Sequence, residues 1–431
     1  MDLLSHHIRR NIFVILTGLG VALAGAKPAA ADELANARWW KGNMHTHTLW
    51  SDGDDYPEMV ARWYKQHNYN FLVLSDHNIL QNVDRWTNPE KNKGGVKALM
   101  RYEKEFGSDW VVRRTAGDVT EVRLRTLGEI QAALQDPGHF ILMPGEEITA
   151  RYLTSPIHMN ASNIQSILQP ATGDSVVDVM QKNVDLVWDQ RKATGEPILI
   201  HLNHPNFGWG VTAEELMQVK GENFFEVYNG HPSVRNIGDN IHASTERMWD
   251  IILTWRLAVL DMPVMYGVAT DDSHSYFTDS PSASVSGRGW VMVKSPELKS
   301  ASLVHAMENG DFYASSGVEL DSLQWESGKP LFVRPKAAPG ESFTFTFIGT
   351  KKGFDQTNQK IRTSSGEALR ITHRYSDDVG AVLQSSSGLE ATYDFQGNEL
   401  YVRCLIESSR PMEFPLREGD RMRAWLQPVR P

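Results

Sequence analysis

Short runs of apolar residues alternate along the first three-quarters of the chain with longer segments whose apolar positions recur every three to four residues. The run 71–74 has the length and composition of a buried strand, and the segment 176–192 has the period of an amphipathic helix. Regular alternation of strands with helices indicates an α/β fold with a parallel sheet. We predict strands at 39–47, 71–74, 140–143, 157–160, 197–200, 224–228 and 264–270, and helices at 57–66, 127–134, 176–192 and 240–259.

Two segments depart from this alternation. Residues 81–125 are polar and rich in Lys, Asn and Gly, which predicts an insertion over the mouth of the fold. After residue 317 the helical period disappears, and short β-type runs follow at 343–347, 369–372 and 400–406. We therefore expect an α/β domain over 32–317, of a size that suits a barrel, followed by an antiparallel β-sandwich over 318–431.

The N-terminus has the pattern of a secretory signal. Arg9 and Arg10 precede the apolar run 12–26, and Ala29-Ala30-Ala31 supplies small residues for cleavage. If residues 1–31 are removed by cleavage, we expect a periplasmic or secreted protein without a stable membrane span. A retained membrane anchor is the alternative, and the arginine pair is compatible with twin-arginine export.

Composition narrows the class of protein. The 431 residues are 41% hydrophobic and 22% charged, as in ordinary globular proteins, and the formal net charge is −10. The negative charge argues against binding to duplex nucleic acid, whose affinity depends on Lys and Arg contacts to phosphate. The single cysteine, Cys404, excludes an internal disulfide framework and a Cys-rich zinc module.

Imidazole and carboxylate side chains follow the ends of several predicted strands. In a barrel of parallel strands all carboxyl ends face one side, where the active site is built. The i, i+2 spacing of His45 with His47, and of Asp272 with His274, places both members of each pair on one strand face. Others at strand ends are His77, Glu147 and His204. This ligand set without thiolate suits Zn, Mn or Fe, and such a metal lowers the pKa of a bound water to about 7.

The order of these motifs resembles the PHP (polymerase and histidinol phosphatase) superfamily. The resemblance is carried by M-H-T-H-T at 44–48, S-D-G at 51–53, S-D-H-N at 75–78, G-E-E-I-T at 145–149, His158, H-P at 204–205 and D-S-H at 272–274. The segments 47–54, 226–230 and 312–317 are similar to an exported branch that includes carbaryl-hydrolase-like metallohydrolases.

The resemblance implies a distorted (β/α)7 barrel of the TIM type that holds two or three divalent metal ions. His45, His47, Glu147 and Asp272 would hold one ion, and Glu147 would bridge to a second ion completed by His158 and His204. Asp52, His77 and His274 would hold a third. Glu146 and Asp271 are the alternatives to their neighbours.

Further residues are candidates for supporting roles. Asp76 and Glu226 are expected to orient ligands or transfer protons. Arg235 and Arg288 follow strand-end loops and are candidates for binding an anionic substrate group, and His231 is expected to line the site.

Together these features predict an exported metal-dependent hydrolase that acts on a small-molecule substrate, a phosphate mono- or diester. Hydrolysis of a carbamate or carboxylic ester is the alternative reaction, favoured by Trp50, Trp63 and Trp209. A non-catalytic, metal-containing protein that binds a glycan or envelope component is a third reading, against which the intact ligand set counts.

Overall fold

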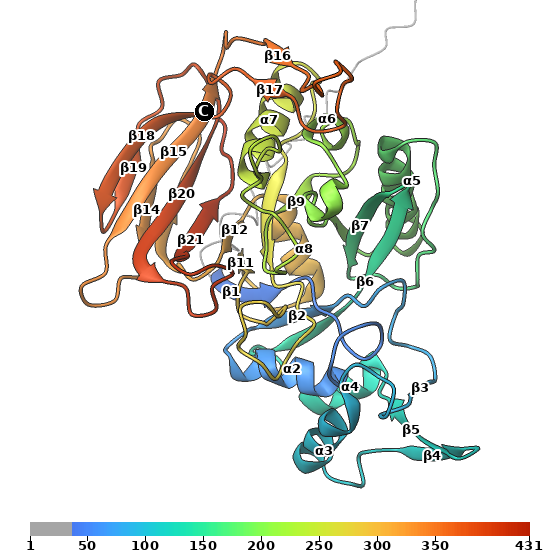
Figure 1. The fold of residues 1–431 in the computed structure, drawn as a ribbon. Helices are drawn as coiled ribbons and strands as arrows, with labels where there is room; N and C mark the ends of the chain where they lie inside the picture. The colour runs from blue at the N-terminus through green and yellow to red at the C-terminus, as the bar shows by residue number, and fades with distance from the viewer. Residues whose placement is uncertain (1–36) are drawn as a thin grey trace, which may run out of the picture. The chain divides into compact units, whose positions relative to one another are not determined.

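The structure, a computed structural model, describes residues 37–431, and the predicted signal segment 1–31 lies outside the described residues. Most predicted elements are present within a few residues of their expected bounds (Figure 1). The elements up to residue 315 are β1 (Arg38–Asn43), α2 (Pro57–Gln66), β2 (Phe71–Leu74), β3 (Arg85–Thr87), α3 (Gly95–Phe106), β4 (Arg113–Ala116), β5 (Val119–Leu124), α4 (Leu127–Leu134), β6 (Ile141–Tyr152), β7 (Ser155–Ser162), α5 (Val176–Thr194), β8 (Leu199–Leu202), a 3₁₀ turn (Phe207–Trp209), α6 (Ala213–Leu216), β9 (Phe224–Asn229), α7 (Thr245–Ala258), β10 (Tyr266–Thr270), β11 (Trp290–Ser295), α8 (Ser300–Glu308) and β12 (Phe312–Ser315).

Most strands in the α/β part of the central sheet run in the same direction. Strand β1 pairs in parallel with β2 and β2 with β6, while β8 pairs in parallel with β9 and β9 with β10. Between these two sets β7 is antiparallel to both β6 and β8, so all six parallel strands point the same way. Strand β2 is buried along its whole length, which explains its continuous apolar sequence.

A closed barrel is not confirmed. The hydrogen-bonded strand order is open and has β10 at one edge. Beyond the strand ends, Thr46 and Ser273 form one isolated parallel bridge, so the tip of β10 approaches the tip of β1 without a continuous ladder. The predicted α/β architecture with a largely parallel sheet is therefore present, and its closure into a (β/α)7 barrel stays a prediction.

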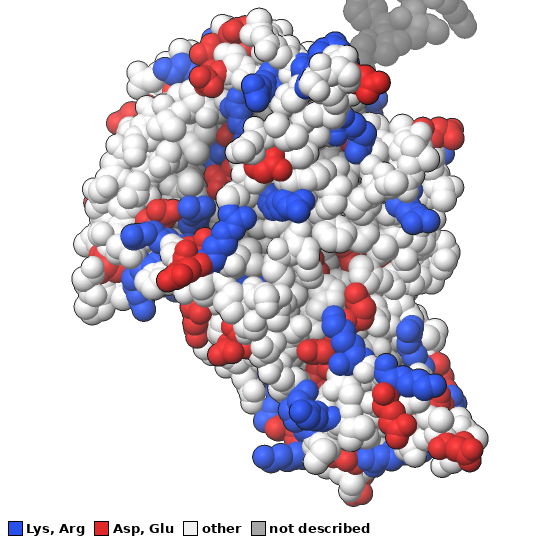
Figure 2. Space-filling model, viewed as in Figure 1, with Lys and Arg blue, Asp and Glu red and all other residues white. Residues whose placement is uncertain are grey.

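The insertion 81–125 has a small sheet and a core of its own. Its strands lie in the order β3-β5-β4, and helix α3 packs its buried Ala98 and Tyr102 against residues of the 49–56 loop. Charged side chains of both signs gather over this part at the bottom of Figure 2, whereas the middle of that face is mostly uncharged.

The C-terminal region is antiparallel, as expected. Its strands are β13 (Leu320–Gln324), β14 (Leu331–Pro335), β15 (Phe343–Lys351), β16 (Asn358–Gln359), β17 (Arg374–Tyr375), β18 (Ala381–Gly388), β19 (Ala391–Tyr393), β20 (Glu399–Pro411) and β21 (Arg421–Leu426). The sheet β13-β14-β19 shares a hydrophobic core with β15 and β20, and β21 pairs with β12. The central sheet therefore continues into the C-terminal region, across the boundary predicted at residue 317.

The strand predicted at 369–372 is wrong. These residues form no ladder because their polar groups bind α6: Thr372 Oγ1 accepts a hydrogen bond from the Ala213 amide, and Arg370 pairs with Glu215.

Candidate metal centre

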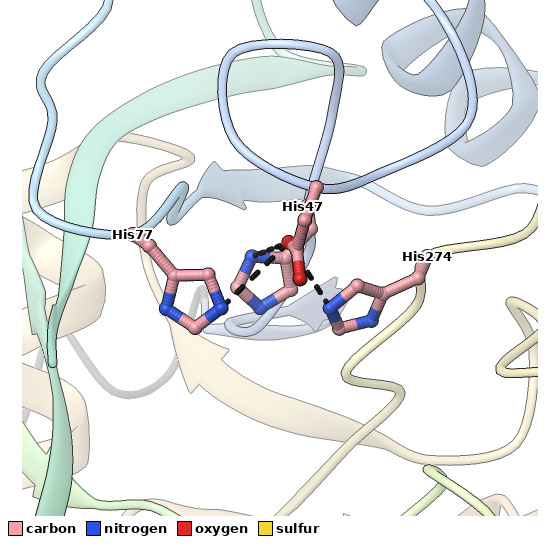
Figure 3. Close-up of side chains that lie close together, drawn as sticks. His47, His77 and His274 are labelled. Carbon is pink, nitrogen blue, oxygen red and sulfur yellow. Dashed lines mark ion pairs between the residues drawn. The ribbon is translucent and has the colours of Figure 1, made fainter. Parts of the chain in front are cut away.

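The structure brings all nine predicted metal ligands together. Side-chain nitrogen and oxygen atoms form four overlapping groups, and the atoms of each group lie within 4.8 Å of one another. The groups are His47, Asp52, His77 and His274; His45, His47 and Glu147; His45, His204 and Asp272; and His77, Glu147 and His158. Figure 3 shows the imidazole rings of His47, His77 and His274 side by side, each reaching inward from a different segment.

Asp52 reaches this cluster through a tight turn after β1. Its Oδ1 lies 3.6 Å from His47 Nδ1, 3.7 Å from His77 Nε2 and 3.3 Å from His274 Nε2. The turn closes at Gly53, where a Cβ atom would lie 2.5 Å from the His47 carbonyl oxygen. The S-D-G sequence thus has a structural reason, since glycine lets the chain fold back closely enough to place Asp52 beside three imidazoles.

Glu147 lies at the centre of the cluster. Its two carboxylate oxygens are 2.8–3.5 Å from ring nitrogens of five histidines, namely His45, His47, His77, His158 and His204. Glu147 belongs to two of the four groups, which suits the bridging role that the resemblance implies.

The neighbouring Glu146 points to the other side of β6, as the alternation of a strand requires. Its Oε1 accepts a hydrogen bond from the Leu168 amide at 2.6 Å, and burial raises the pKa of its carboxyl to about 8. The geometry therefore favours Glu147 over Glu146 as the ligand.

The two consecutive aspartates also have different partners. Asp272 Oδ1 lies 3.3 Å from His45 Nε2 and 3.2 Å from His47 Nε2. Asp271 instead accepts hydrogen bonds from the Tyr64 hydroxyl and from three consecutive backbone amides, those of residues 287–289. Asp271 thus anchors a loop, while Asp272 faces the imidazoles.

The electrostatics of the cluster favour cations. Burial opposes ionisation of Glu147 and Asp272, but the surrounding histidines hold the pKa of both carboxyls well below the usual range. Burial, reinforced by His274, lowers the pKa of His47 to about 3, so this ring is neutral and offers a lone pair. Burial also opposes protonation of His77, yet the carboxylates of Glu147 and Asp52 raise its pKa to about 9. Ionised carboxylates inside the protein therefore attract either protons or metal ions.

Two candidate ligand atoms make no hydrogen bond. His45 Nε2 and His47 Nε2 are buried and have no hydrogen-bond partner within the described part of the chain, although each lies 3.2–3.5 Å from carboxylate oxygens of Glu147 and Asp272. Buried polar atoms without hydrogen bonds are costly, and metal coordination would satisfy both nitrogens. Mixed imidazole and carboxylate donors are the set that divalent transition metals prefer, so the residues fit such ions.

Glu226 orients two of the ligands. Its Oε1 accepts from His45 Nδ1 at 2.7 Å, which leaves His45 Nε2 facing the cluster, and its Oε2 accepts from the backbone amide of His204 at 2.7 Å. This is the supporting arrangement common around metal-binding histidines.

Sequence reasoning missed the amides and hydroxyls around the ligands. Asn203 donates to Glu147 Oε1 at 2.8 Å, Asn229 donates to both Glu226 and Asp272, and Thr149 Oγ1 lies 2.6 Å from His77 Nδ1. The only indication in the sequence is their position next to the motifs, at the ends of β8 and β9 and in β6.

The backbone is strained at two ligands. His204 has φ of 21° and Asp272 has φ of 48°, in the left-handed region that side chains other than glycine rarely adopt. Strained conformations of this kind concentrate at functional sites, where the surrounding structure holds them.

Other predicted site residues lie outside the cluster. Asp76 is buried and accepts hydrogen bonds from Thr48, Ser51 and Gln81, so it fixes the turn that carries Asp52. Arg288 is fully buried and donates to backbone carbonyls, three of them those of Gly230, Pro281 and Ala283, which leaves it unable to reach a substrate at the cluster.

Two predicted residues have more favourable positions. His231 lies beside the cluster, with its ring centroid 5.4 Å from that of His274. Arg235 is exposed and its guanidinium lies over the ring of Trp209 at 5.1 Å.

The fold and the cluster define an α/β protein with a largely buried group of six histidines and three carboxylates at one side of its parallel sheet, a set of side chains that could hold metal ions. No family model and no curated protein matches this sequence. Among solved structures, a two-domain protein from Bacteroides vulgatus ATCC 8482, described as containing a predicted PHP-like metal-dependent phosphoesterase, is 14% identical with a TM-score of 0.37 over 92% of this chain and 96% of that one. A candidate metal-dependent phosphoesterase from Bifidobacterium adolescentis ATCC 15703 is also 14% identical, with a TM-score of 0.26 over 54% of this chain and 87% of that one. Both similarities are too weak to transfer an activity.

Within residues 37–431, no helix is long and apolar enough to cross a membrane.

Proposed function

We propose that this protein is an exported metal-dependent hydrolase that cleaves phosphate mono- or diesters. The observation that carries the proposal is the convergence of six histidines and three carboxylates from sequence-distant segments, with buried imidazole nitrogens that make no hydrogen bond. A purely structural cluster would be expected to satisfy these nitrogens with hydrogen bonds.

The ions would be held by the nine ligands, with Glu147 shared between two of them. Glu147 also lies close to His158 and His204, so these two histidines are proposed to complete the second ion. Asp52, His77 and His274 would hold a third. When bound, such ions polarise a phosphoryl group and lower the pKa of water.

The chain's own residues prepare the site for these ions. Glu226 fixes the orientation of His45, and Asn203 holds one oxygen of Glu147. The buried carboxylates stay ionised, so bound cations are needed before an anionic ester is attracted rather than repelled.

The experiment is metal analysis of the purified protein together with an ester panel. We expect two or three equivalents of Zn, Mn or Fe per chain, and hydrolysis of phosphate esters that a chelator abolishes and the metal restores. Absence of bound metal, or metal-loaded protein that hydrolyses no phosphate ester, contradicts the proposal.

Hydrolysis of carbamate or carboxylic esters is the second candidate. Phe207 supports it, because its ring lies edge-on to His204 at 5.1 Å and 6.1 Å from His158, and an apolar ring beside the ligands suits an uncharged aromatic ester. A panel that includes aryl carbamates and aryl acetates separates the two reactions.

Export is proposed from the sequence of residues 1–31 alone. Cell fractionation of the full chain beside a chain that begins at Asp32 tests it, and equal distribution of both between fractions contradicts it.

A further inference from the structure

A cavity of about 700 Å³ opens beside the metal centre. Its lining comes from the β6–β7 hairpin, the 170–172 loop and the loop after β8. The residues are Thr149, Ala150, Arg151, Leu153, Thr154, Pro156, His158, Pro170, Ala171, Thr172 and Gly208. Since His158 belongs to the cluster and Thr149 touches His77, the cavity adjoins the ligands directly. Its volume lies in the range of pockets for organic ligands and far exceeds what a phosphoryl group needs.

Strand β6 connects the metal centre to the cavity. Glu147, Thr149 and Arg151 alternate along the strand and therefore share one face. The register places Thr149 opposite His158 and Arg151 opposite Pro156. Arg151 thus lies about 7 Å beyond Thr149 along the strand and about 14 Å beyond Glu147.

The charge of the cavity differs from that of the cluster. None of its lining residues is acidic. Arg151 is exposed and makes no ion pair or side-chain hydrogen bond with any of residues 37–431. The cavity therefore presents one uncommitted cation, about 7 Å along the strand from the Thr149–His158 pair, a distance that an aryl group can span.

The tip of the hairpin is shaped at a conformational cost. Leu153 has φ of 53°, although its side chain is 77% exposed and gains little from burial. With Pro156, Pro170 and Ala171 it provides apolar wall. Tyr152 pairs with Ser155, so Leu153 begins a two-residue turn, and turns of this length favour a positive φ at that position.

We propose that this cavity receives the organic part of the ester, and that Arg151 binds a second anionic group on it. The inference rests on the proposed phosphoesterase function and specifies its substrate class: phosphate esters of bulky, largely apolar alcohols that carry a carboxylate or a similar anion.

Matched pairs of probes test this with the metal-loaded, full-length protein. The turnover of phenyl phosphate is compared with that of 4-carboxyphenyl phosphate. Calorimetry compares the binding of benzylphosphonate with that of 4-carboxybenzylphosphonate, neither of which is hydrolysed. The variant is Arg151→Ala. The control is Arg334→Ala, which removes an exposed arginine of β14 that pairs with Asp321 of β13.

We expect the wild-type protein to prefer the carboxylated member of each pair by about tenfold, the size of a charge-assisted contact at an exposed site. Arg151→Ala should remove that preference, change phenyl phosphate turnover by less than about twofold and leave bound metal unchanged, while Arg334→Ala keeps the preference.

The outcomes separate the two proposals. If the wild-type protein hydrolyses phosphate esters without preferring the carboxylated probes, the cavity assignment is wrong and the phosphoesterase proposal stands. The same conclusion follows if the preference for the carboxylated probes survives in Arg151→Ala. Discrimination between the phosphonates that depends on Arg151, without any phosphate hydrolysis, overturns the phosphoesterase and preserves the cavity as a site for anionic organic ligands.

Discussion

At the scale of single residues, Glu147 lies at the middle of the candidate metal centre. Five imidazole nitrogens lie within 3.5 Å of its oxygens, and the adjacent Glu146 occupies the other face of the strand. The two residues therefore provide a comparison of the same side chain at adjacent positions, with Glu147 ionised among the histidines and Glu146 kept protonated near neutral pH by burial.

We expect Glu147→Ala to lower bound metal by more than one equivalent per chain and to abolish hydrolysis, because two ions lose a shared anionic ligand. Glu146→Gln should keep metal and activity. Elemental analysis and turnover measure both effects. Full metal content in the Glu147 variant, with loss of metal in the Glu146 variant, would reverse the assignment.

Asp55 is a buried carboxyl that follows Asp52 by three residues. Its Oδ2 makes no hydrogen bond with any of residues 37–431. Burial raises the pKa of its carboxyl to about 8 from an ordinary value of 3.8. The folded protein therefore keeps a proton that the unfolded chain loses near pH 4, and this contribution to stability falls as the pH rises from about 4 to about 8.

Replacing the carboxyl by an amide removes that dependence. Asp55→Asn is expected to unfold at a higher temperature than the wild-type protein at pH 8, by an amount corresponding to a few kcal/mol, and to differ little from it near pH 4. Thermal unfolding of both proteins across this pH range is the measurement. Parallel curves for the two proteins would show that Asp55 is ionised in the folded state.

At the scale of elements, Arg370 connects three segments around the metal centre. Its guanidinium pairs with both carboxylate oxygens of Glu215 on α6, and it donates to Ser155 Oγ at 2.9 Å and to the Gly210 carbonyl at 2.7 Å. Ser155 begins the strand that carries His158, and Gly210 follows the loop that begins at His204. The C-terminal region thus braces two loops that carry ligands.

Arg370→Ala is expected to speed amide hydrogen exchange in 152–155 and 207–210 and to lower kcat/KM by about tenfold, on the order of 1 kcal/mol for a half-exposed charged contact. Lysine at this position should not restore protection, since it lacks the planar fork that spans these acceptors. Arg362→Ala is the control, because the Arg362 side chain donates to the Gly366 carbonyl, four residues along the same C-terminal segment. Unchanged exchange in both loops would exclude a bracing role.

At the scale of the whole molecule, the α/β part and the C-terminal strands depend on each other. Tyr313 of β12 pairs with Leu426 of β21, and the buried Arg403 on β20 binds Asp250 on α7 at 2.7 and 2.8 Å. From the sequence, residues 318–431 would be dispensable for the chemistry, because no candidate ligand follows residue 317. The structure gives them a role in stability instead.

A chain ending at residue 317 is expected to be insoluble or to unfold well below the full-length protein, since the edge of β12 becomes exposed and Asp250 loses its partner. Asp250→Ala tests the same contact in the intact chain and should destabilise it by about 3–5 kcal/mol, whereas replacing both partners by apolar residues should be close to neutral. Soluble yield and thermal unfolding report on each protein. A truncated chain that stays soluble and metal-loaded would show that the α/β part folds independently.

The sequence by itself determined the α/β class, the position of most strands and helices, and the set of side chains that converge at the strand ends. These features follow from local periodicity and from the rule that parallel strands end on one side, and both are written in neighbouring residues. Seven of the nine candidate ligands were identifiable from their positions after predicted strands, whereas Asp52 and His158 were implied by the resemblance to the PHP superfamily.

Only the tertiary structure decided how these parts are used. Glu226 and His45 are 181 residues apart, and Arg370 and Ser155 are 215 apart, so no local pattern could connect them. Arg288 has the sequence context of a substrate-binding arginine, yet its guanidinium is taken up by backbone carbonyls of distant loops. Arg151 belongs to none of the motifs, and only the register of β6 with β7 places it beside the cavity. Hydrogen bonds and ion pairs between distant segments depend on the folded path of the chain, which is why the supporting residues and the cavity emerged from the structure alone.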